Sequence, residues 1–164
     1  MGPVAVANVT NDELDAFKEN AGLNRSRRNF KFIDHTADMG IQVYGQSLAL
    51  LFQHAAEGFY YIITDPERIR EKESREISVK GNGLEDLLVN WLNELVYLFE
   101  TSGFLFRRFE VLDLGEFFID AVAFGERLDE EYHPVLRTVK ATTYHQLHVT
   151  RGKAGWEARV IFDL

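Results

Sequence analysis

FKFIDHTADMGIQVY, residues 30 to 44, is the stretch that decides the fold. Apolar and polar residues alternate over residues 30–33 and again over residues 41–44, with the period of a half-buried β-strand. Between these two runs lie two carboxylates, an imidazole and a hydroxyl. The pattern predicts two neighbouring strands joined by a polar loop that contains Asp34 and Asp38, and a loop of this composition indicates a binding role.

Two amphipathic helices follow from the spacing of apolar residues. After Ser47, a residue type that caps helix N-termini, apolar side chains recur on one helical face from Leu48 to Ile63. A second apolar stripe covers residues 84–99, where Asn82 and Glu85 resemble a capping pair and a glycine at 103 ends the helix. Such stripes are typical of core-facing helices.

The rest of the chain reads as short strands separated by turns. The predicted strands cover residues 74–80, 104–112, 117–124, 144–150 and 156–162. Two helices that interrupt runs of strands predict an α+β fold with largely antiparallel or mixed sheets packed against the helices. We expect residues 30–164 to form a single domain.

Residues 1–29 differ in composition and are interpreted as an N-terminal extension with one short helix beginning near Asn11. A basic cluster, Arg25, Arg27, Arg28 and Lys31, follows. It could contact RNA or an acidic partner, but a solvated linker is the commoner outcome for such a charge run.

Composition excludes several classes of function. The chain has 164 residues and a formal net charge of −8, from 18 basic and 26 acidic side chains. A surplus of negative charge repels phosphate backbones, so we expect no strong direct binding to nucleic acid. Because cysteine is absent, disulfides, thiolate catalysis and sulfur-bound zinc are excluded. With neither a signal pattern nor a spanning apolar run, we expect a soluble cytoplasmic protein that does not enter a membrane.

Asp34 and Asp38 are the first candidates for metal ligands. Their hard oxygen donors suit calcium or magnesium better than zinc. The simpler interpretation is that both carboxylates bond loop amides. Asp163, close to the end of a predicted core strand, is either a third ligand or the salt-bridge partner of Lys140, and the pattern favours the salt bridge.

Two other classes of function stay open at this point. His35, His133 and His145 lie beside polar groups, and a metal-dependent hydrolase could use the cluster of Asp34, His35 and Asp38. No hydrolase, nucleotide-loop or zinc-protease motif supports that class, however. A chaperone-like binding module is a third reading, which the aromatic content encourages only weakly.

Three motifs in order resemble the archease family, whose members are accessory proteins of the tRNA-splicing RNA ligase. They are DHTADMGI over residues 34–41, LLVNWLNEL over residues 87–95, and KATTYH over residues 140–145 followed by VIFDL over residues 160–164. The resemblance covers residues 30–164 and leaves the extension outside.

The resemblance implies a non-enzyme that promotes guanylylation of a GTP-dependent RNA ligase and so permits multiple turnover in tRNA splicing. It implies a divalent-metal site at Asp38 and Asp163, with Asp34 close by; calcium is favoured, and magnesium or manganese are alternatives. Its partner would be the ligase protein. The resemblance also implies a functional surface made of His35, Lys140, Thr143, Tyr144 and His145.

Overall fold

The structure is a computed structural model that describes residues 29–34 and 38–164. The predicted helix near Asn11 and most of the predicted extension lie outside these residues, as do residues 35–37 of the polar loop. Along the described chain the elements are β1 (Phe30–Asp34), β2 (Asp38–Gly45), α3 (Leu48–Ile63), η1 (Pro66–Arg68), β3 (Glu73–Lys80), α4 (Leu84–Ser102), β4 (Phe104–Leu114), β5 (Phe118–Arg127), β6 (Ala141–Gly152) and β7 (Gly155–Asp163).

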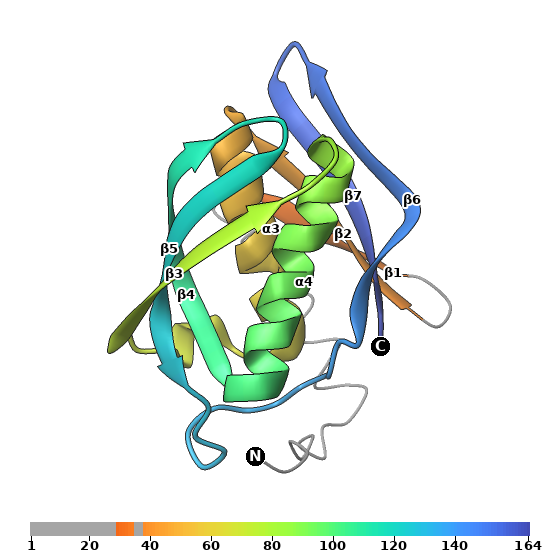
Figure 1. The fold of residues 1–164 in the computed structure, drawn as a ribbon. Helices are drawn as coiled ribbons and strands as arrows, with labels where there is room; N and C mark the ends of the chain where they lie inside the picture. Colours follow the sequence, from red (N-terminus) through yellow and green to blue (C-terminus); the bar gives the residue numbers. More distant parts are fainter. Residues whose placement is uncertain (1–28, 35–37) are drawn as a thin grey trace.

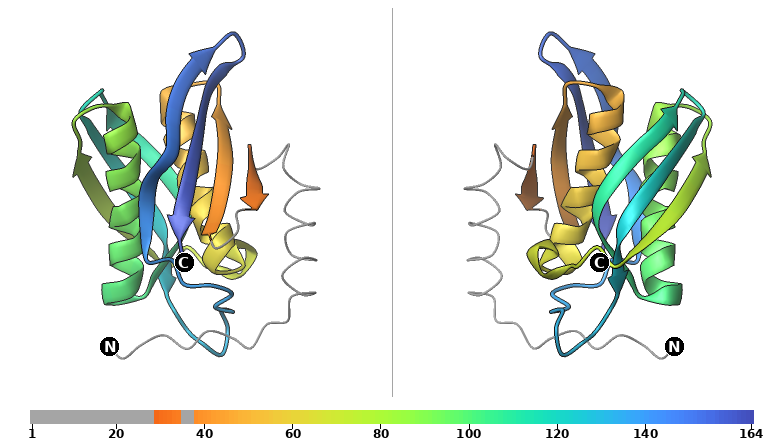
Figure 2. Two further views of the ribbon diagram at one scale, coloured as in Figure 1. Left: turned by 90° about the vertical axis from the view of Figure 1, so that its right-hand side faces the viewer. Right: turned by 90° about the vertical axis from the view of Figure 1, so that its left-hand side faces the viewer.

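The strands form two antiparallel sheets (Figure 1). Sheet A has the order β1-β2-β7-β6, and sheet B has the order β3-β5-β4. Figure 2 shows the two sheets on opposite sides of α3, which contacts β2 of sheet A and β4 of sheet B. Helix α4 contacts β6 and β3, so each helix also joins the two sheets. The predicted α+β fold class is confirmed.

Helix α3 begins and ends where the sequence predicts. The Ser47 hydroxyl accepts a hydrogen bond from the Leu50 amide at 3.2 Å, which satisfies one of the free N–H groups of the first turn. The helix ends before Thr64, whose amide donates to the Tyr60 carbonyl. The Trp91 indole on α4 donates to the Phe52 carbonyl of α3 at 3.0 Å, so the core holds the two helices together through a buried polar contact as well as apolar packing.

Helix α4 is capped differently from the prediction. Its N-cap residue is Gly83, which has no side chain, and the Asp86 carboxylate reaches back to accept from the Asn82 amide at 2.8 Å. The predicted pairing of Asn82 with Glu85 was therefore wrong, because the glycine shifts the cap by one residue. At the other end Gly103 adopts a left-handed conformation with φ 65°, as expected for a helix-ending glycine.

The starts of two strands differ from the prediction. Asp38 is the first residue of β2 rather than a loop residue, because its backbone pairs with β7. Strand β6 begins at Ala141, three residues before the predicted start, and contains a register shift between Thr143 and His148. The polar loop is thus shorter than predicted, and its acidic residues lie at strand ends that the sheet holds.

The connecting loop, residues 128–140, runs from sheet B to sheet A and is attached to both helices. The Leu128 amide donates to the carbonyl of Gly103 after α4, and the Leu136 amide donates to the carbonyl of Ile63 at the end of α3. The Thr64 hydroxyl donates to the Pro134 carbonyl at 2.7 Å. These bonds fix the path of the chain into β6. Among the described residues, no helix is long and apolar enough to cross a membrane.

Candidate functional site

Asp38 and Asp163 occupy directly opposite positions on the neighbouring strands β2 and β7. In an antiparallel pair, directly opposite residues lie on the same face of the sheet with their Cβ atoms about 4.5–5.5 Å apart. The C-terminal end of the chain accordingly lies beside the end of the β1–β2 hairpin in Figure 1. The structure brings together two acidic residues that sequence spacing alone could not connect.

The charge of this pair favours a cation. Asp163 is exposed and Asp38 is half-buried, and like charges directly opposite each other on a sheet are destabilising. A bound cation would remove that repulsion. Both donors are carboxylate oxygens, the ligand type that calcium and magnesium prefer, so the two residues fit the predicted class of ion.

The described residues do not complete a metal site. Within residues 29–34 and 38–164, no three His, Asp or Glu side chains converge as metal ligands. Asp34 ends β1 and pairs through its backbone with Met39, and its side chain is not described. Because calcium takes about 6–8 oxygen ligands, Asp38 and Asp163 would need carbonyls, waters or residues outside the description to complete the shell.

The KATTYH motif, residues 140–145, lies along the same edge of the site. Ala141 is the β6 partner of Asp163, and the Lys140 amide donates to the Asp163 carbonyl at 2.8 Å. The Thr143 hydroxyl donates to the Ile161 carbonyl at 2.9 Å. No ion pair joins the Lys140 side chain to Asp163 in the described part of the chain, so the salt bridge that the pattern favoured was wrong. The contact runs through the backbone instead.

A bulge in β6 moves the rest of this motif away from Asp163. Gln146 has a positive φ of 51°, and residues 144–147 have no partner on β7. Tyr144 is 60% exposed, yet its hydroxyl donates to the Asp86 carboxylate on α4. This hydrogen bond is the main cause that lowers the pKa of Asp86 and raises the pKa of the Tyr144 hydroxyl. His145 is exposed beside Tyr144, and His35 lies outside the described residues.

Asp86 and Asn93 are polar contacts of this surface that sequence reasoning missed. The Asn93 side-chain oxygen accepts from the Thr142 amide at 2.7 Å and so attaches the start of β6 to α4. A signal was present, since both are polar residues in an amphipathic helix. It pointed only to a polar helix face, because the partners are strand residues far away in sequence.

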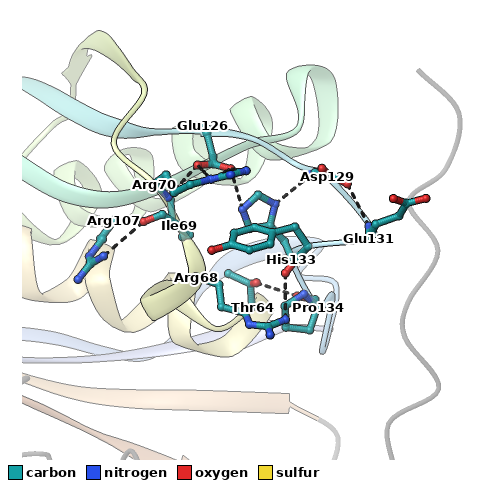
Figure 3. Close-up of polar contacts among 11 residues, drawn as sticks. Thr64, Arg68, Ile69, Arg70, Arg107, Glu126, Asp129, Glu131, His133 and Pro134 are labelled. Carbon is teal, nitrogen blue, oxygen red and sulfur yellow. Dashed lines mark hydrogen bonds and ion pairs between the residues drawn. The ribbon is translucent and has the colours of Figure 1, made fainter.

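A second polar cluster includes His133, one of the candidate histidines, which is part of the connecting loop (Figure 3). The Asp129 amide donates to Nδ1 of His133 at 2.9 Å. Since Nδ1 accepts, its proton must be on Nε2, which lies 3.0 Å from Oε1 of Glu126. His133 is 1% exposed, so a substrate cannot reach its ring. It is therefore not a general base.

Arg70 completes this cluster. Its backbone amide donates to Glu126 at 2.8 Å, and its guanidinium donates to both carboxylate oxygens. Burial acts to raise the pKa of Glu126, but the hydrogen bonds and the positive charge of Arg70 outweigh it and lower that pKa overall. The arginine also lies over the Tyr132 ring at 4.3 Å. The cluster joins Arg70 and the end of β5 to the connecting loop, which indicates that it fixes the path of that loop.

The chain is similar to known proteins. Residues 30–164 match the Archease protein family. The chain is 40% identical over 141 residues to the protein archease of Methanosarcina barkeri, covering 84% of this chain and 97% of that protein. It is 38% identical over 138 residues to the protein archease of Saccharolobus solfataricus, covering 84% and 99% respectively.

Two solved structures have a similar fold. The solution structure of Methanobacterium thermoautotrophicum protein 1598 superposes with a TM-score of 0.73 at 31% identity, covering 84% of this chain and 99% of that chain. The crystal structure of an archease, possible chaperone, from Thermotoga maritima superposes with a TM-score of 0.58 at 21% identity, covering 80% and 94%. The match to the family over the described domain and the identity to its curated members lead to one conclusion: this chain belongs to the archease family.

Proposed function

We propose that this protein is a non-enzymatic, cytoplasmic activator of a GTP-dependent tRNA-splicing RNA ligase. It promotes transfer of GMP to the ligase histidine and so permits repeated turnover. Membership of the archease family supports the proposal. The structural observation that carries it is the pairing of Asp38 with Asp163 beside Lys140, which gathers the first and third family motifs at one end of sheet A.

In this proposal Asp38 and Asp163 hold a divalent ion, calcium by preference, with Asp34 as the third acidic residue. Bound there, such an ion supplies concentrated positive charge of the kind that phosphate groups seek. The protein's own residues would position the ion. Strands β2 and β7 fix the two carboxylates, and the Lys140 amide fixes the end of β7. The net charge of −8 favours encounter with the basic surroundings of an RNA ligase active site.

GMP transfer to the purified cognate ligase tests the proposal. The assay compares ligase alone with ligase plus this protein, in chelator and in each of calcium, magnesium and manganese. We expect stimulation by the wild-type protein and its loss in Asp38→Asn and Asp163→Asn. Asp113→Asn is a matched control, because Asp113 lies directly opposite Asp120 on sheet B and presents the same local charge arrangement away from the motifs.

The outcomes separate the parts of the proposal. Equal guanylylation with and without the wild-type protein would remove the activator role. Stimulation that persists in Asp38→Asn and Asp163→Asn, or that is lost equally in Asp113→Asn, would keep the activator role and remove the metal site.

A chaperone-like role is the second candidate, favoured only by the description of the Thermotoga maritima structure as an archease, possible chaperone. Suppression of aggregation of unrelated client proteins tests it. Suppression that is equal in wild-type protein and Asp38→Asn would support this role, whereas no suppression would exclude it.

A further inference from the structure

A pocket of about 810 Å³ lies at the end of sheet A opposite to Asp38 and Asp163. It is lined by the end of β2, the first turns of α3 and the β6–β7 hairpin, which is at the top of Figure 1. The two ends of β2 are about 24 Å apart, because the seven steps along its eight residues rise about 3.4 Å each. Small-molecule sites have volumes of about 300–1,000 Å³. The pocket is therefore a separate site with room for a small molecule.

Glycines shape this pocket. Gly155 has a positive φ of 120°, and a Cβ atom there would lie 2.7 Å from the carbonyl oxygen of Gly45. The hairpin approaches the end of β2 this closely because Gly155 has no side chain. Lys153 and Ala154 form the two-residue turn between β6 and β7, and both line the pocket. The backbone thus holds the charged turn residue at the pocket.

The charge of the lining favours an anion. Arg151 and Lys153 are exposed basic residues, and Glu157 is an exposed acidic one. Nδ1 of His54 lies 2.6 Å from the Tyr44 carbonyl oxygen, which can only accept, so this nitrogen carries a proton. With His54 neutral, two cations and one carboxylate leave one net positive charge. This local charge is opposite in sign to the net charge of −8 of the whole chain.

The basic cluster of the sequence joins the described domain at the wall of this pocket. Asn29 lines the pocket, and its side-chain nitrogen lies 3.4 Å from Nε2 of His54. Arg25, Arg27 and Arg28 directly precede Asn29 in the chain. Any charge that this segment adds beside Asn29 has the same sign as the lining.

Aromatic rings line the same pocket. Trp156 is half-buried, and Tyr44 is 39% exposed. The Arg151 guanidinium lies over the Trp156 ring, 5.8 Å from its centre. Nucleic-acid bases stack on aromatic side chains, and arginine binds phosphate groups. Because one sugar separates base from phosphate in a nucleotide, a single molecule can use the ring and the cations together.

We propose that this pocket binds a nucleotide, with its base against Trp156 and its phosphate between Arg151 and Lys153. The Glu157 carboxylate, which accepts from the Thr150 hydroxyl at 3.5 Å, can also accept from an N–H group of the base. A free nucleotide and the terminal nucleotide of an RNA offer the same chemistry. Since two exposed cations hold the phosphate, binding is weak and decreases with added salt.

NMR titration of the full-length protein tests the proposal, because its two tryptophans report on different places. The indole N–H signals of both are followed as GMP is added at low salt. Ribose 5-phosphate lacks the base and guanosine lacks the phosphate, and each is titrated in parallel. We expect GMP to shift the Trp156 signal saturably and to bind about tenfold more tightly than either fragment. Trp91, which is 0% exposed and donates to the Phe52 carbonyl, should not move.

Variants separate the two halves of the ligand. Arg151→Gln combined with Lys153→Gln should weaken GMP binding about tenfold or more and leave guanosine unchanged. Trp156→Leu, followed through the backbone amide of Gly155, should abolish the advantage of GMP over ribose 5-phosphate. Lys72→Gln is the matched control, because Lys72 is an exposed cation outside the pocket, and it should leave GMP binding unchanged.

A short single-stranded RNA identifies the source of the nucleotide. Binding at least tenfold tighter than that of GMP, and lost in the double variant of Arg151 and Lys153, assigns the pocket to an RNA end. Affinity similar to that of GMP assigns it to a free nucleotide. If millimolar GMP leaves the Trp156 signal in place, or if Lys72→Gln weakens binding as much as the double variant does, the proposal is overturned. The assay contains no ligase, so its failure leaves the activator proposal standing.

Discussion

Nε2 of His133 lies 3.0 Å from Oε1 of Glu126 at a site where both side chains are almost completely buried. The pair joins the end of β5 to the connecting loop, which then runs to Lys140 and the site at the end of sheet A. The position of the KATTYH motif, residues 140–145, therefore depends on polar contacts that lie outside the motif itself.

Glu126→Gln should lower the free energy of unfolding by about 1–2 kcal/mol, because it weakens hydrogen bonds to a charged group in a buried setting. Urea denaturation monitored by circular dichroism measures this. Glu110→Gln, an exposed position on sheet B, is the control and should change stability by less than about 0.5 kcal/mol. Equal effects of the two substitutions would contradict a special role for Glu126.

Glu126 should also make the free energy of unfolding depend on pH. The folded-state pKa of Glu126 lies below its ordinary value of 4.5, so the unfolded chain binds the proton first as the pH falls. The stabilising contribution of Glu126 is complete above that value and is lost as the pH falls through the lowered pKa. Unfolding free energies measured across acid pH should fall less steeply in Glu126→Gln than in wild-type protein. Parallel curves for the two proteins would rule out this origin of the acid sensitivity.

Asp163→Asn should separate two effects of the pair Asp38 and Asp163: charge repulsion without an ion, and stabilisation by bound calcium. In chelator the variant should be as stable as wild-type protein or more stable, because the substitution removes repulsion with Asp38. Calcium should stabilise the wild-type protein by about 2.7 kcal/mol when free ion exceeds Kd a hundredfold, and it should not stabilise Asp163→Asn. Thermal unfolding measures both, and Asp113→Asn should keep the calcium response. A calcium response that survives in Asp163→Asn would count against this residue as a ligand.

Tyr144 and Asp86 should titrate as a linked pair. Tyr144→Phe should raise the pKa of Asp86 toward its ordinary value of 3.8, and Asp86→Asn should lower the pKa of Tyr144 toward 10.0, because each loses the same hydrogen bond. Since the folded-state pKa of Tyr144 is raised, its contribution to stability is lost as the pH rises through that value. NMR titration of both groups is the measurement. Tyr97→Phe on α4 should leave Asp86 unchanged, and a shift there would point to a general effect of the helix.

Gly125→Ala should be strongly destabilising, because a Cβ atom at this position of β5 would lie 1.8 Å from the Leu105 carbonyl oxygen. Backbone cannot move aside as a flexible side chain can, so we expect a loss of about 3 kcal/mol, the upper end for overpacking. Gly152→Ala is the control, since the nearest atom is 4.0 Å away. Chemical denaturation of both variants checks the difference, and similar stabilities would show that the β4–β5 contact adjusts freely.

The helices, most strands and the fold class could be predicted because local periodicity and capping encode them. Helix α3 matches at both ends, since the Ser47 cap and the apolar stripe are local signals. The opposition of Asp38 and Asp163 could not be derived from spacing, because strand register between distant segments leaves no local pattern. Only the family resemblance linked the two residues.

The cluster of Arg70, Glu126 and His133 escaped prediction for the same reason. Arg70 and Glu126 are 56 positions apart, and each looks like an ordinary charged residue in its own segment. What makes Glu126 special is its burial, which depends on how the connecting loop packs. The N-terminal cap of α4 was also predicted incorrectly. Its N-cap residue is Gly83, so Asp86 and not Glu85 accepts the hydrogen bond from the Asn82 amide.

Strand β7 lies between β2 and β6 in sheet A although it is the last strand in the chain. During synthesis the ribosome must therefore release residues 155–163 before the hairpin of β1 and β2 can gain its second neighbour. Closing so long a loop is entropically unfavourable and slows folding in proteins dominated by distant strand pairing. Until then β2 exposes an unsatisfied edge, and the nascent chain is most vulnerable to aggregation in that interval.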